Sequence, residues 1–87
     1  MTPEQLATYF ADNQNQILAD WEALLRFPSI STDEAHAANC LNCANWLTDY
    51  LKASGFAAQQ LATPTKPVVY AERSGAPGAP VVLLYGH

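Results

Sequence analysis

The fold is decided near the end of the sequence, by the stretch Pro80-Val81-Val82-Leu83-Leu84-Tyr85-Gly86-His87. Five consecutive apolar residues, starting with two β-branched valines, lie between a proline and a glycine. Such a short apolar run predicts a strand that is buried on both faces. Gly86 and His87 follow at its carboxyl end, where ligands bind in open α/β sheets because side chains from neighbouring strand ends converge there. His87 is therefore the first candidate site residue.

The composition indicates an acidic globular protein. Of the 87 residues, 49% are hydrophobic and 14% are charged, and eight acids against four bases give a net charge of -4. So few basic residues argue against nucleic acid or an anionic membrane as a partner. The first residues, Met1 to Gln5, lack the basic and apolar segments of a signal peptide. We therefore expect a cytoplasmic protein, and two cysteines in a helical pattern agree with a reducing compartment.

A long N-terminal helix is predicted over Pro3–Arg26, from apolar residues at helical spacing. Thr2 and Gln5 form a capping box at its start. The apolar pattern lapses at residues 13–16, where we expect the helix to be frayed or bent. Pro28 ends it, because the residue before a proline disfavours helical geometry.

A second helix is predicted to start at Ser31, with Glu34 completing a capping box, and to end at Gly55 in the left-handed conformation. Its inward stripe contains Cys40, Cys43, Ala44, Leu47 and Leu51. Four aromatic residues at helical spacing on the two helices are predicted to lie in the core: Tyr9, Phe10, Trp21 and Trp46.

Three strands are predicted to follow, over residues 56–62, 68–72 and 81–85. The loop at 74–80 is too short for a crossover helix, so the second and third strands should be antiparallel neighbours. We therefore expect an α/β fold in which two helices cover one face of the sheet. The other face of 81–85 needs a cover that these residues do not supply, which indicates an incomplete domain. The alternative is a complete small α+β domain with an apolar edge that recruits other strands.

Two sets of side chains are candidate metal ligands. His87 at a strand end suits zinc, although a histidine after a glycine is by itself a weak signal. His36, Cys40 and Cys43 lie on one side of a helix, but a structural zinc site usually has four ligands. We favour core packing for both cysteines and a solvated position for His36. Two carboxylates show no partner for acid–base chemistry: Asp49 and Glu72.

The sequence also resembles one known family over nearly its whole length. The motifs, in order, are Leu24-Leu25-Arg26-Phe27-Pro28-Ser29-Ile30-Ser31, Val69-Tyr70-Ala71-Glu72, the loop Gly75-Ala76-Pro77-Gly78, and Val82-Leu83-Leu84-Tyr85-Gly86-His87. They are similar to the N-terminal part of the co-catalytic dizinc peptidases and amidohydrolases, which include aminoacylase, carnosinase, glutamate carboxypeptidases and succinyl-diaminopimelate desuccinylase. The tyrosine before Gly-His most resembles the dipeptidase-like branch.

This resemblance implies that residues 1–87 are the N-terminal part of a three-layer catalytic domain. His87 would be the first zinc ligand, in a Gly-His-x-Asp motif whose aspartate bridges two zinc ions. The Glu-Glu pair, the other ligands and the dimerising lid domain would lie outside these residues. The implied activity is hydrolysis of peptide or N-acyl amino acid amide bonds, with residues 1–87 alone inactive. The alternative is a non-enzymatic α+β protein-interaction module.

Overall fold

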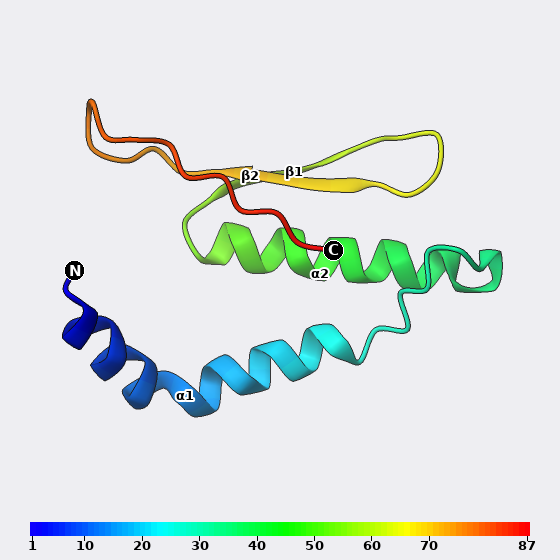
Figure 1. Cartoon of the computed structure of the whole chain (residues 1–87). Helices are drawn as coiled ribbons and strands as arrows, with labels where there is room; N and C mark the ends of the chain where they lie inside the picture. Colours follow the sequence, from blue (N-terminus) through cyan, green and yellow to red (C-terminus); the bar gives the residue numbers. More distant parts are fainter.

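The computed structural model describes residues 1–87 and is an α+β structure, with two long helices and a two-stranded antiparallel sheet (Figure 1). The predicted α/β arrangement with three strands is therefore only partly formed. The elements, in chain order, are α1 (Pro3–Leu25), the short 3-10 helix η1 (Glu34–His36), α2 (Ala37–Ala53), β1 (Ala57–Leu61) and β2 (Val68–Glu72).

Helix α1 begins at the predicted capping box and is unbroken. The Gln5 N–H donates to Thr2 Oγ1 at 3.1 Å, and the Thr2 N–H donates to Gln5 Oε1 at 2.8 Å. Asn13 Nδ2 donates to the carbonyl oxygen of Tyr9 at 2.9 Å, a side-chain contact of the kind that bends a helix. Figure 1 shows α1 bent near its middle, with its N-terminal half turning upward beyond the end of α2. The expected weak point is thus bent and not frayed.

The start of α2 differs from the prediction. Ser31 is not its cap. Instead, the Asp33 carboxylate accepts from the Ala35 N–H at 2.9 Å and caps η1, and α2 continues from η1 at Ala37. A carboxylate two residues further on thus satisfies one of the free N–H groups of the first turn.

The predicted end of α2 is confirmed. Gly55 has a φ of 93°. Its N–H donates to the Lys52 carbonyl at 3.0 Å, and the Phe56 N–H donates to the Leu51 carbonyl at 3.0 Å. These two hydrogen bonds form a Schellman motif, which requires a residue that tolerates the left-handed region.

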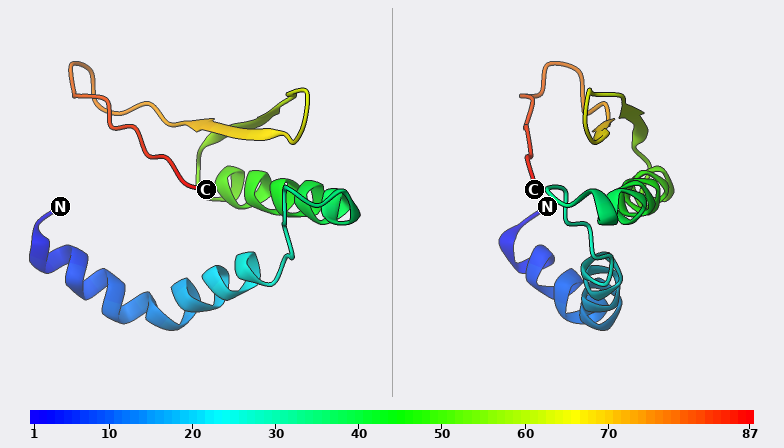
Figure 2. Two further views of the ribbon diagram at one scale, coloured as in Figure 1. Left: turned by 45° about the vertical axis from the view of Figure 1, so that its right-hand side comes forward. Right: turned by 90° about the vertical axis from the view of Figure 1, so that its right-hand side faces the viewer.

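The core lies between α2 and one face of the hairpin (Figure 2). Strand β1 pairs with β2 antiparallel, with Gln59 opposite Tyr70. Alternate residues on each strand are half-buried: Ala58, Gln60, Val69 and Ala71. Three residues are buried, all on α2: Cys40, Ala44 and Thr48. Thr48 is polar but pairs its hydroxyl with the Ala44 carbonyl at 2.7 Å.

The predicted aromatic core is only partly correct. Trp46 stacks on Tyr50 with ring centroids 5.3 Å apart and lies 6.3 Å from Phe27, so these rings join the end of α1 to α2. The other three aromatic residues are 48–59% exposed, because nothing covers the rest of α1: Tyr9, Phe10 and Trp21.

The predicted third strand does not form. Residues 81–85 have no regular secondary structure, and their side chains are 78–95% exposed. Strand β2 pairs with β1 and not with 81–85. The physical reason is that 81–85 carries apolar side chains on both faces, whereas α2 already covers β1 and β2 and no second layer is present. Figure 2 shows the segment running back past β2 on the side away from β1.

We predict that Gly55→Ala lowers the free energy of unfolding by about 1–2 kcal/mol, because alanine is strained in the left-handed region. A Cβ on Gly55 would lie 3.7 Å from Arg73 Nη1, an ordinary contact, so the cost lies in the backbone. Urea denaturation followed by circular dichroism measures it. Gly75→Ala is the control, since Gly75 has an ordinary φ and open space around it. Equal stability of the two variants would contradict the prediction.

Candidate functional site

The candidate site residue His87 lies beside α2 and not at a strand end. Segment 80–87 turns back across the molecule (Figure 1), and its last residue shares a hollow with residues of α2 and of the loop after α1. The imidazole is exposed and borders a hollow of about 240 Å³. Nine residues from four parts of the chain line this hollow: Ser29, Ser31, Cys40, Cys43, Ala44, Leu47, Lys66, Pro67 and His87.

The polar groups in this hollow come from several elements. The loop after α1 supplies the two serines, and the inward face of α2 supplies the two cysteines. Lys66, from the loop between β1 and β2, pairs its ammonium group with the Glu34 carboxylate at 3.1 Å. Part of the positive charge at the rim is therefore compensated before any ligand binds. Packing of α2 against the hairpin thus brings the three segments to His87.

The residues present do not by themselves form a zinc site. No cluster of three or more His, Cys, Asp or Glu side chains is placed to hold a metal ion. Catalytic zinc takes three protein ligands and keeps one position open, whereas the family resemblance gives this chain only His87. The other ligands would have to come from polypeptide outside residues 1–87.

The second candidate metal site, formed by His36, Cys40 and Cys43, serves the packing of α2. Cys40 is 8% exposed and belongs to the core, and Cys43 beside it is half-buried; both are free thiols. This confirms the predicted packing role for Cys40, whereas Cys43 is only partly buried. His36 was expected to be solvated but is half-buried, with Nδ1 3.1 Å from Asn39 Oδ1 and Nε2 4.0 Å from Asp33 Oδ2. Its ring joins η1 to the first turn of α2.

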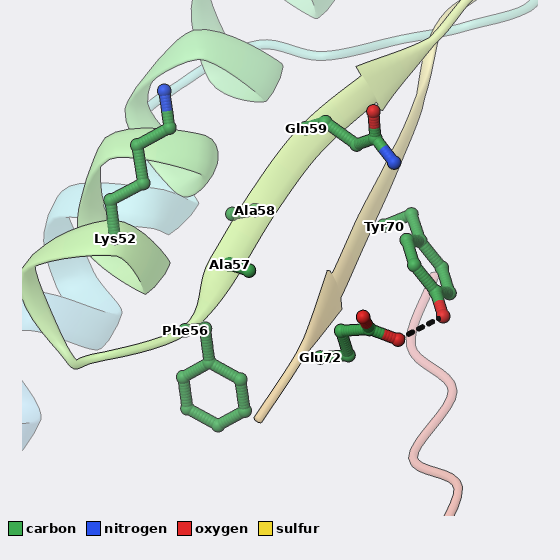
Figure 3. Close-up of a pocket in the computed structure, with 7 residues that line it drawn as sticks. All are labelled: Lys52, Phe56, Ala57, Ala58, Gln59, Tyr70 and Glu72. Atoms are coloured by element: carbon green, nitrogen blue, oxygen red, sulfur yellow. Dashed lines mark hydrogen bonds between the residues drawn. The ribbon is translucent and has the colours of Figure 1, made fainter. Parts of the chain in front are cut away.

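A second hollow, of about 390 Å³, lies over the opposite end of the hairpin (Figure 3). Lys52 and Phe56 come from the end of α2 and the connection after it, and the other lining residues come from β1 and β2. Tyr70 and Glu72 point the same way from β2, and the phenol donates to the carboxylate at 2.9 Å. Residues that lie two positions apart on a strand are on the same face of the sheet, so this pair could have been found in the sequence.

The Tyr70–Glu72 contact changes the acidity of the phenol. The hydrogen bond to Glu72, and then the negative charge of that carboxylate, raise the pKa of Tyr70 above its ordinary value. The pKa of Tyr50 is also raised, first by burial and then by the nearby Asp20 carboxylate. Both phenols therefore stay neutral donors at physiological pH. Neither is an activated nucleophile or base.

Comparison of the sequence with family models and curated proteins, and of the structure with solved structures, found no match. None of the helices combines the length and the apolar character that crossing a membrane requires. The family resemblance described above therefore stays an expectation.

We predict that Glu72→Gln lowers the pKa of Tyr70 toward its ordinary value, because the amide keeps an acceptor but carries no charge. Glu72→Ala should lower it further by removing the hydrogen bond as well. Titration of the tyrosine ring resonances by NMR measures both. Tyr50 is the internal control, since Asp20 and not Glu72 acts on it. An unchanged Tyr70 pKa in both variants would contradict the assignment.

We also predict that the 87-residue chain binds zinc with a dissociation constant weaker than about 1 μM, because a single imidazole is too few ligands. Isothermal titration with zinc measures it, and the His87→Ala variant separates binding at His87 from binding at the cysteines. Tight 1:1 binding that is lost in His87→Ala would show that these residues do form a metal site.

Proposed function

We propose that residues 1–87 are the N-terminal part of a zinc-dependent exopeptidase or dipeptidase of the co-catalytic dizinc family. The parent protein would hydrolyse peptide or N-acyl amino acid amide bonds in the cytoplasm. One observation carries the proposal: the family-like motifs occur in the family's order along nearly the whole sequence and end in Tyr85-Gly86-His87.

The apolar surface of the chain supports this proposal. Residues 81–85 are almost fully exposed, and the sheet face opposite α2 exposes large apolar side chains at 43–51%. These side chains are Leu61, Val68 and Tyr70. Exposed apolar patches of this kind mark surfaces that another part of a protein covers. A larger catalytic domain with a second layer over the sheet is one such cover.

In the proposed parent protein, His87 is the ligand that this part of the chain contributes to a pair of zinc ions. Zinc ions in such sites act as Lewis acids on the scissile carbonyl. The bridging aspartate, the Glu-Glu pair and the remaining ligands are expected outside residues 1–87, as is a lid domain through which two subunits associate. The described residues hold the His87 segment beside α2 and cover one face of the sheet.

The first test is the continuation of the reading frame. We expect an aspartate two positions after His87 and a Glu-Glu pair well downstream. If instead no such acidic residues follow, the small α+β interaction module becomes the better explanation, because the exposed apolar surface would then need a protein partner.

The second test uses the full-length parent protein loaded with zinc. We expect it to hydrolyse dipeptides or N-acyl amino acids, and His87→Ala to reduce kcat/KM by at least about 100-fold, the upper end of the loss seen for residues that only support a ligand. The zinc content should fall with it. His36→Ala is the matched control, because it removes the other imidazole and should leave activity unchanged. Full activity of His87→Ala would overturn the proposed role.

A further inference from the structure

The two cysteines of the chain lie one turn apart on α2 and border the same hollow. Cys40 is 8% exposed and Cys43 is half-buried, and both are free thiols. Both line the hollow of about 240 Å³ between α2, the loop after α1 and the loop between the strands. Packing uses the apolar surface of these side chains and leaves the sulfur lone pairs free. The hollow therefore contains two neighbouring sulfur ligands.

The geometry of the helix fixes how far apart these two side chains lie. Residues 37–53 are α-helical, and Cβ atoms three positions apart in an α-helix are about 5–6 Å from each other. A disulfide needs about 3.5–4.5 Å between its two Cβ atoms, so a direct bond between the sulfurs would distort the helix. A metal–thiolate bond is about 2.3 Å long, so an ion between two sulfurs holds them up to about 4.6 Å apart. The pair therefore suits a bridging ion better than a disulfide.

The number of available ligands decides which ion suits the pair. His36 lies one turn before Cys40, but its ring contacts Asn39 and does not line the hollow. His87 does line the hollow, yet no three His, Cys, Asp or Glu side chains are placed to share one ion. Structural zinc takes four ligands, and iron–sulfur clusters are also held by four cysteines. Among the biological ions that thiolates select, monovalent copper is the one that accepts only two.

The hollow also supplies a charge of the right sign. Two thiolates and one monovalent copper ion form a complex with a single negative charge. With histidine counted as neutral, Lys66 is the only residue in the lining that carries a charge. Its ammonium group lies 3.1 Å from the carboxylate of Glu34, whose side chain is 89% exposed and so is screened by water. The ammonium group therefore keeps attraction for an anionic complex in the hollow.

We propose that Cys40 and Cys43 form a two-coordinate site for monovalent copper, separate from the zinc pair of the proposed parent protein. Each thiol loses its proton as its sulfur binds, so one copper ion replaces two protons and no electron is transferred. Cys43 is the ligand that solvent reaches, and Cys40 holds the complex on the core side of α2. Both ligands come from one helix, so the site requires neither zinc nor the proposed peptidase activity.

Competition with a chromophoric copper(I) chelator tests the site, with the full 87-residue chain reduced and kept free of oxygen. We expect one copper ion per chain. Cys40→Ser and Cys43→Ser should each weaken binding by at least about 100-fold, because losing a ligand costs more than losing a group that only supports one. His36→Ala and His87→Ala are the matched controls and should bind copper like the unmodified chain. Circular dichroism checks that each variant keeps its helices.

Native mass spectrometry and alkylation with iodoacetamide test whether both ligands come from one chain. We expect a complex of one chain with one copper ion, in which both thiols are protected from alkylation until a chelator removes the metal. A copper ion shared between two chains, binding that persists at full strength in either serine variant, or binding that is lost in His87→Ala would overturn the proposal. None of these outcomes bears on the proposed peptidase activity, which requires zinc.

Discussion

The contact between α2 and one face of the hairpin is the interaction on which the rest of the structure depends. The three buried residues, Cys40, Ala44 and Thr48, lie on the inward face of this helix. Their small side chains allow the hairpin to approach closely, and Gln60 Nε2 adds a hydrogen bond to Asn45 Oδ1 at 2.6 Å. Since burial of apolar area is the main stabilising term in folding, a core this small leaves the chain only marginally stable.

The surfaces that this contact leaves uncovered are as informative as the core. Apolar side chains remain exposed on three surfaces: the stripe of α1, the outer face of the sheet and residues 81–85. One layer of helix can cover one face of a sheet, so a second layer or a second copy of the chain is needed for the rest. The proposed catalytic domain would provide such a second layer.

The candidate site shows how local chemistry depends on this packing. The hollow beside His87 exists because α2, the loop after α1 and the loop between the strands meet there. Its cysteines, the proposed copper ligands, are free thiols on the inward face of α2, and its lysine is paired with Glu34, so the groups left for another ligand are the imidazole and the two serine hydroxyls. Tyr70 and Glu72 form a self-contained pair in the second hollow, where the carboxylate stabilises the neutral phenol.

Local features were determined by the sequence itself: the capping box at Thr2, the stop at Gly55 and strand 68–72 all follow from nearby backbone and side-chain preferences. The pairing of Tyr70 with Glu72 was equally readable. Only the tertiary structure decided that β2 pairs with β1, that residues 81–85 stay unpaired, and that His87 lies beside α2. The physical reason is that pairing and burial depend on which surfaces are available as cover, and an apolar run specifies a need for cover without specifying what provides it.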